Sequence, residues 1–216
     1  MITASGDGGN FGITGTLTLN NGLLDVNTKG GNISISGNIT SAGADEALTL
    51  DDGTGSGTIT LGGTVSTGDI TLIGDGGIEL GGNITSNKTG AAGAIAFTGP
   101  VTIADTASDS VTIDADQHAD TTVTFNATAT VNAATSGGQS LTIDTDAGAI
   151  AMQGAIGGST ALSALTINAD GAGTIEVANI GASGVGVTGA TAIGNTNTAT
   201  LTLDGTVYNT TGSQTY

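Results

Sequence analysis

"LTIDTDAGAIAMQGAIGG" (141–158) is followed, after a short interval, by "LTINADGAGTIEVANIG" (165–181), which repeats its pattern. Both copies begin with Leu-Thr-Ile, and their first residues, Leu141 and Leu165, are 24 positions apart. Aspartate, glycine and aliphatic residues then fall at corresponding places, so what recurs is a series of local environments. A recurrence with a period of about 20–50 residues predicts a stack of similar structural units.

A three-residue motif, apolar–Thr–apolar, recurs along the chain. It occurs at 17–19, 48–50, 59–61, 70–72, 101–103, 111–113, 123–125, 141–143, 165–167 and 201–203. Because strand side chains alternate between two faces, the motif predicts short strands with apolar side chains inward and threonine outward. Clusters of Gly, Asn, Asp and Ser between the motifs predict turns, and no helical periodicity of useful length remains. The chain is therefore predicted to be all-β.

Two all-β architectures compete for this pattern. A sandwich or barrel requires hairpin signals and usually an aromatic core, whereas aromatic residues make up 2% of this chain. A parallel β-helix requires a recurring unit of one coil, and such units start at Leu48 and Ile70, 22 positions apart. We predict a single parallel β-helix, or β-solenoid, over 1–216 with coils of roughly 20–25 residues. Looser spacing predicts longer loops or irregular coils around 98–140 and 184–200.

A single coil of this kind cannot bury its aliphatic face alone and does so by stacking on its neighbours. In the two copies we expect Leu141, Ile143, Ile150 and Ile156 to lie against Leu165, Ile167, Ile175 and Ile180. Alternation predicts an inward core of Leu48, Leu50, Ile59, Leu61, Ile70, Leu72, Ile78, Leu80, Val111, Ile113, Leu141, Ile143, Ile150, Leu165, Ile167, Ile175 and Val177.

The charge balance restricts the partners that this chain can have. Nineteen acidic residues stand against Lys29 and Lys88, which gives a net charge of −17, and arginine is absent. Binding to nucleic acid or to an anionic membrane requires cationic side chains, so we predict neither partner. No apolar run approaches the roughly 18 residues of a membrane-spanning helix. No signal peptide is visible, so we expect Met1 to start a piece of a longer protein. Cysteine is absent, so stability cannot depend on disulfides or thiolate metal sites.

Two stretches carry a resemblance to a known family. "GAIAMQGAIGGSTALSALTINADGAGTIEV" (148–177) and "TATLTLDGTVYNTTGSQTY" (198–216) resemble repeats of the filamentous-haemagglutinin-like adhesins and related giant secreted repeat proteins of bacteria. The resemblance extends from about Leu48 onward and is clearest over 141–216. It implies a right-handed parallel β-helix, export across the outer membrane and a role in attachment. The family's amino-terminal secretion module and any membrane-anchoring domain are missing, which implies an interior piece of a shaft.

The strongest candidate for a binding site lies in "VTIDADQHADTTVTF" (111–125). If the strand alternation continues, Asp114, Asp116, His118 and Asp120 point outward together. Their carboxylates are candidate Ca²⁺ ligands, and backbone carbonyls could complete the about six to eight oxygens that Ca²⁺ takes. The alternative is a solvated acidic face without a ligand. His118 is the only histidine, so neither a catalytic triad nor a multi-histidine zinc site can be built, and no cofactor other than Ca²⁺ is expected.

Parallel β-helices also include polysaccharide lyases and hydrolases, which makes an enzyme the main rival class. Carboxylates that could act in pairs are Asp51 with Asp52 and Asp144 with Asp146, both expected at repeat corners. Adjacent residues on a strand face opposite sides, however, and the chain has no arginine to bind an anionic substrate and few aromatic residues to stack a sugar. We therefore predict no enzymatic activity.

Together these observations predict a non-catalytic, structural and adhesive β-solenoid segment on the surface of a bacterial cell or secreted from it, with a receptor that the sequence does not identify. The chain carries no recognisable cap at either end, so a fibre subunit that stacks head to tail is one alternative. An ice-binding solenoid is another, provided that the outward threonine residues align across coils. A polysaccharide-degrading enzyme is the third.

Overall fold

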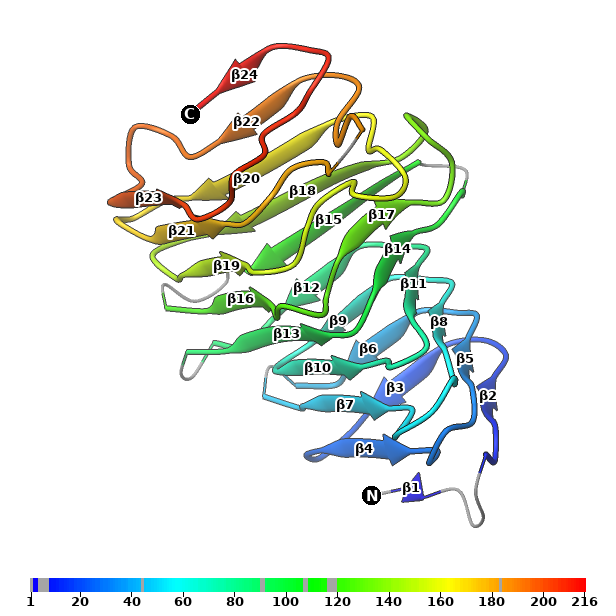
Figure 1. Cartoon of the computed structure of the whole chain (residues 1–216). Coiled ribbons are helices and arrows are strands. Elements are labelled where there is room, and N and C mark those ends of the chain that lie inside the picture. Colours follow the sequence, from blue (N-terminus) through cyan, green and yellow to red (C-terminus); the bar gives the residue numbers. More distant parts are fainter. Residues whose placement is uncertain are drawn as a thin grey trace.

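The chain folds as an all-β parallel solenoid of about eight turns, formed by three parallel sheets (Figure 1). The computed structural model describes the backbone of residues 2–3 and residues 8–43, 45–89, 92–106, 109–115, 120–182 and 184–216. The amino terminus lies at one end of the stack and the carboxyl terminus at the other. These described residues contain no helix of the length and apolarity that a bilayer crossing requires.

Each turn contributes one strand, or one isolated bridge, to each of three sheets, here called A, B and C. Sheet A contains β1 (Ile2–Thr3), β4 (Leu24–Asn27), β7 (Leu48–Asp51), β10 (Ile70–Ile73), β13 (Ala94–Thr98), β16 (Thr122–Phe125), β19 (Ile150–Met152), β21 (Thr174–Val177) and β23 (Thr200–Leu203). Sheet B contains β2 (Phe11–Ile13), β5 (Ile33–Ile35), β8 (Ile59–Leu61), β11 (Ile78–Leu80), β14 (Val101–Ile103) and β17 (Val131–Ala133). Sheet C contains β3 (Leu17–Leu19), β6 (Ile39–Ser41), β9 (Val65–Thr67), β12 (Ile84–Ser86), β15 (Ser110–Ala115), β18 (Ser140–Thr145), β20 (Leu165–Ala169), β22 (Thr191–Ile193) and β24 (Gln214–Thr215). Every strand pair between these elements is parallel, as a solenoid requires.

The predicted stacking of the two sequence copies is confirmed residue by residue. The partners are Leu141 with Leu165, Ile143 with Ile167, Ile150 with Ile175 and Ile156 with Ile180. The last pair is an isolated bridge, because sheet B narrows to single bridges after β17.

Coil length varies more than the sequence repeat suggested. Ile59 pairs with Ile78, 19 positions later, whereas Ile113 pairs with Ile143, 30 positions later. Both 30-residue coils overlap residues 98–140, because Val101 likewise pairs with Val131. The strands stay short throughout, so the extra residues lie in the loops between them.

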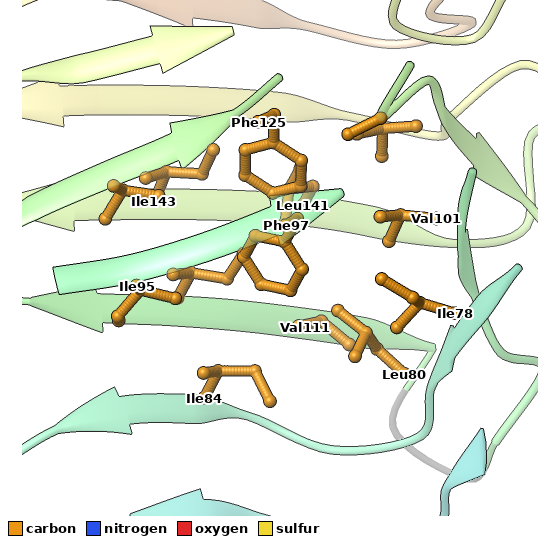
Figure 2. Packing of buried hydrophobic residues seen from close by; sticks show 14 of the residues in the cluster. Ile78, Leu80, Ile84, Ile95, Phe97, Val101, Val111, Phe125, Leu141 and Ile143 are labelled. Carbon is orange, nitrogen blue, oxygen red and sulfur yellow. The ribbon is translucent and has the colours of Figure 1, made fainter. Parts of the chain in front are cut away.

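The core is a narrow stack of aliphatic side chains that point inward from the three sheets (Figure 2). Every residue of the predicted core is buried, with at most 2% of its surface exposed. Burying each large aliphatic side chain contributes about 1.5–3 kcal/mol relative to leaving it in water. Two aromatic residues interrupt the aliphatic ladder: Phe97 and Phe125 pair across β13 and β16, with ring centroids 4.3 Å apart in a stacked geometry.

Asparagine side chains hold the corners of successive coils together. Asn38 Oδ1 accepts a hydrogen bond from the backbone N–H of Thr64, one coil later, at 3.0 Å. Asn179 Oδ1 accepts two, from the N–H groups of Thr206 at 2.8 Å and Val207 at 3.0 Å. These bonds satisfy backbone donors where the strand ladder is interrupted, which is a requirement for any buried or half-buried turn. Sequence reasoning had assigned the asparagine residues only to turns.

Candidate functional site

The acidic stretch that the sequence singled out is divided between two elements. Asp114 lies in β15, which ends at Ala115, and Asp120 is exposed just before β16. Asp116 and His118 lie outside the described residues. The proposed Ca²⁺ ligation by Asp114, Asp116 and Asp120 therefore stays a prediction. Across the described ranges, no group of three or more His, Cys, Asp or Glu residues is placed to hold a metal ion.

Asp114 is instead stacked in a polar row on sheet C. The strand register puts it beside Asp144 of the next coil, and Asn168 follows in the coil after that. Asn168 Nδ2 donates a hydrogen bond to Asp144 Oδ1 at 3.0 Å. Asp144 thus lies within β18 and not at a corner, and an amide from the neighbouring coil engages its carboxylate.

The pair Asp51 and Asp52 confirms that adjacent residues at the end of a strand face opposite sides. Asp51, the last residue of β7, points outward and accepts hydrogen bonds from Asn27 Nδ2 at 2.8 Å and from the Gly53 N–H at 2.7 Å. Asp52 points inward and has no exposed surface. The two carboxyl groups are therefore in different environments and do not form the pair of facing carboxylates that glycoside hydrolysis uses.

Sequence analysis named Asp52 only as a partner of Asp51 at a corner and did not predict that its carboxyl group is buried. Its Oδ1 accepts a hydrogen bond from the Asp75 N–H at 3.1 Å, while Oδ2 has no hydrogen-bond partner among the described residues. Burial raises the pKa of the Asp52 carboxyl above its ordinary value, and the charges of Asp75 and Asp51 raise it further. The backbone N–H groups of Asp75 and Gly76 act in the opposite direction. The sequence signal for this buried acid was the pair of consecutive aspartates at the end of a strand. Adjacent residues there face opposite sides, so one of the two faces the core.

An open pocket of about 780 Å³ lies at the same corner of the coil. Its lining residues are Asn27, Lys29, Asp51, Gly53, Thr54, Ile73 and Asp75. The pocket carries one cationic group, from Lys29, and carboxylates from Asp51 and Asp75. Ile73 is the one large apolar side chain among these lining residues, so hydrogen-bonding groups outnumber aliphatic anchors for a ligand.

The outward side of sheet C carries two columns of small polar side chains, here called the sheet C polar face. The first column contains Thr18, Thr40, Ser66, Thr85, Asp114, Asp144 and Asn168. The second contains Thr16, Asn38, Thr64, Asn83, Thr112, Thr142 and Thr166. Neighbouring members are about 4.8 Å apart along the stack and about 6.7 Å apart across it. The first four coils of this face carry no charge, and the Oγ1 atoms of Thr18 and Thr40 are 3.3 Å apart.

Comparison of the chain with protein-family models, with curated proteins and with solved structures gives no match. The three-sheet β-solenoid of about eight turns is therefore the established feature of the molecule. Its pocket, its buried acid and its polar face are the features from which a function can be proposed.

Proposed function

We propose that the chain is a non-catalytic structural and adhesive segment of a large bacterial surface or secreted protein. The observation that carries this proposal is the continuity of sheets A and C, which each contain nine in-register strands between the two described ends. Backbone hydrogen bonds in such a stack run along the axis, so each coil transmits load to the next. Eight turns at about 4.8 Å each give a rigid spacer about 38 Å long.

The engagement of surface carboxylates supports a structural role over a catalytic one. Asp51 and Asp144 both accept hydrogen bonds from amide side chains of adjacent coils, Asn27 and Asn168. These carboxylates contribute to cohesion between coils. The adhesive and extracellular part of the proposal rests on the resemblance to repeats of giant bacterial adhesins and on a surface rich in short polar side chains, with a net charge of −17.

Retention of cells under flow tests the adhesive role. The chain is displayed on a bacterium that lacks its own adhesins, and detachment is measured on glass, on immobilised mucin and on immobilised polysaccharide. We expect greater retention on at least one surface than with an unrelated displayed domain of similar charge. Retention equal to that of the unrelated domain on all three surfaces contradicts the adhesive role. Release of reducing ends from the polysaccharide contradicts the non-catalytic role.

A second candidate function is the ordering of water at an ice surface, and the sheet C polar face is the specific observation that favours it. Outward threonine residues could form such a surface only if they align across coils, and the strand register aligns Thr18, Thr40 and Thr85 with Ser66. Regularly spaced hydroxyl groups on a rigid sheet can match a periodic lattice of water.

Thermal hysteresis measures this second candidate directly. The unmodified chain is expected to separate the freezing and melting points, and Thr40→Lys, on sheet C, is expected to abolish the effect. Thr49→Lys is the matched control, because Thr49 is also the outward threonine of a strand but lies on sheet A. If the unmodified chain shows no hysteresis, or if both variants lose it equally, the sheet C polar face has no such role.

A further inference from the structure

The open pocket at the corner between sheets A and B is bounded by the loops of three successive coils. Residues 28–32, 52–58 and 74–77 form these loops, whereas only 99–100 join β13 to β14 in the following coil. The strands that precede the three loops, β4, β7 and β10, each have a strand partner on both sides. The pocket therefore belongs to the interior of the stack, and its volume of about 780 Å³ is within the range of small-molecule sites.

One position of this corner carries opposite charges in two of the coils. The strand register pairs the last residues of β4, β7 and β10 with one another. The residues two places further along the chain are Lys29, Gly53 and Asp75, so this position holds a cation, no side chain and an anion in succession. A spacing of about 4.8 Å per coil places the backbones of the two charged residues about 9.6 Å apart.

Neither of these charges belongs to an ion pair within the described part of the chain. Lys88 Nζ and Asp69 Oδ2, 2.6 Å apart, form the one ion pair found there. The side chains of Lys29 and Asp75 are both exposed and both line the pocket. An ammonium group from the first of the three coils and a carboxylate from the last therefore share one pocket without contacting each other.

Side chains of the same corner fix the backbone of both charged residues. Asn27 Oδ1 accepts a hydrogen bond from the Lys29 N–H at 3.0 Å, and Asp52 Oδ1 accepts one from the Asp75 N–H at 3.1 Å. Lys29 has a φ of 52°, in the left-handed region that favours glycine, and Gly53 has a φ of 77° at the same position of the next coil. A glycine would fit this turn with less strain, so the backbone does not explain the lysine.

The remaining carboxylate of the pocket is already engaged. Asp51 accepts hydrogen bonds from Asn27 Nδ2 at 2.8 Å and from the Gly53 N–H at 2.7 Å. Lys29 against Asp51 and Asp75 gives the lining a net charge of −1. A simple anion is therefore repelled, and a simple cation leaves the ammonium group of Lys29 without a partner. A ligand that carries both signs of charge complements both side chains.

We propose that this pocket binds a small zwitterion with the chemistry of a free amino acid. The carboxylate of the ligand contacts the Lys29 ammonium group, and the ammonium group of the ligand contacts the Asp75 carboxylate. Gly53 leaves room for the ligand between the two, and the Thr54 hydroxyl can hydrogen-bond either ligand group. Exposed charge pairs are individually weak, so the affinity is low. This binding is independent of the adhesive role and of the sheet C polar face.

Amide chemical shifts measured by NMR test the proposal in solution. The probes are glycine, β-alanine and γ-aminobutyrate, whose two charges are progressively further apart, and acetate and methylammonium, which carry one charge each. At about 0.01 M salt, at least one zwitterion should give saturable shifts at the amides of Lys29, Gly53 and Asp75, and neither single-charge probe should do so. Salt at about 1 M should weaken the binding, because the screening length falls from about 30 Å to about 3 Å.

Variants that remove one charge each identify the groups responsible. Lys29→Gln and Asp75→Asn should each weaken binding of the zwitterion at least about threefold, as expected for loss of an exposed charge pair. Lys88→Gln is the matched control for the first, because Lys88 is the other lysine and pairs with Asp69. Asp105→Asn is the control for the second, because Asp105 is exposed and does not line the pocket. Circular dichroism confirms that the variants keep their β-structure.

Exchange of the two charges distinguishes a specific site from a general effect of net charge. The double variant Lys29→Asp with Asp75→Lys keeps the net charge of −17 and should bind more tightly than either single variant, because the zwitterion can bind in the reverse direction. The proposal is overturned if no zwitterion gives saturable shifts, if acetate or methylammonium gives the same shifts, or if the control variants lose as much affinity. A double variant that binds no better than Lys29→Gln would also overturn it.

Discussion

Asp52 shows what a single inward position requires of the residue that occupies it. The same row holds Thr28 one coil earlier, which is also fully buried but donates its hydroxyl hydrogen to the Gly31 carbonyl at 2.5 Å. Asp52 has a carboxyl oxygen without a partner instead. A buried unsatisfied oxygen typically costs about 1–3 kcal/mol, and more when the group is charged. The protonated form of Asp52 is therefore the form that the fold favours.

The stability of the solenoid is expected to depend on pH through Asp52. The folded-state pKa of Asp52 lies above the ordinary value of 3.8 because the fold favours the protonated carboxyl group. The stability that this preference contributes is fully present below pH 3.8 and is lost as the pH rises through the folded-state pKa. Asp52→Asn cannot ionise. The melting temperature of this variant minus that of the unmodified chain should therefore increase from pH 4 to pH 8, by several degrees, at about 2–4 °C per kcal/mol.

Asp105→Asn is the matched control for this prediction, since Asp105 is exposed. The control should remove one charge without adding the same pH-dependent difference. A difference between Asp52→Asn and the unmodified chain that stays constant with pH would contradict the assigned environment of Asp52.

The inward ladder predicts a large effect at Ile143. This side chain has no exposed surface and lies between Ile113 and Ile167 of the adjacent coils. Ile143→Asp would bury a charge without a partner and should cost at least about 4 kcal/mol of unfolding free energy. Thr142→Asp, on the outward side of the same strand, should cost less than about 1 kcal/mol. Equal denaturation midpoints for the two variants would mean that the alternation of β18 is wrong.

At the scale of secondary-structure elements, alternation was sufficient to predict most strands and their inward faces. It identified β7, β8, β10, β18 and β20 because aliphatic side chains at every second position can only be buried on one side of a strand. Corners were less predictable. Whether Asp114 is aligned with Asp144 depends on the number of residues in the intervening loops, and loop length has no periodic signal in the sequence.

The polar corners carried the least sequence information. Asparagine favours turns generally, so its presence does not show that its side chain bonds to the next coil. The inward Asp52 and the narrowing of sheet B to single bridges at Ile156 and Ile180 also follow from the path of individual loops. Local composition does not determine that path.

Removal of one corner side chain should loosen one coil and leave the others intact. Asn179→Ala eliminates the acceptor for the N–H groups of Thr206 and Val207. Hydrogen exchange at these two amides should accelerate by at least about tenfold, which corresponds to about 1.4 kcal/mol of local opening free energy. The amides of Ser159 and Thr160 serve as the internal control, because Asn132 holds them in the same way. Uniform acceleration at all four amides would indicate global destabilisation instead.

At the scale of the whole molecule, the solenoid is a one-dimensional stack in which each coil contacts only its neighbours. Stability in such a stack is approximately a sum of coil and interface terms, so unfolding from the ends is expected. The net charge of −17 opposes compaction and association at low salt, and screening should relieve both effects. The order of the coils along the axis is the property on which the proposed structural role depends.

Distances between pairs of spin labels measure that order most directly, because the cysteine-free chain can be labelled at chosen sites. Cysteine is introduced at Thr16 together with Thr112, Thr142 or Thr166, all in one column of the sheet C polar face. These partners lie four, five and six coils from Thr16, so the stacked solenoid predicts separations of about 19, 24 and 29 Å, an increase of about 4.8 Å per coil. Separations that fail to increase in this order, as two packed antiparallel sheets would give, would contradict the stacked solenoid.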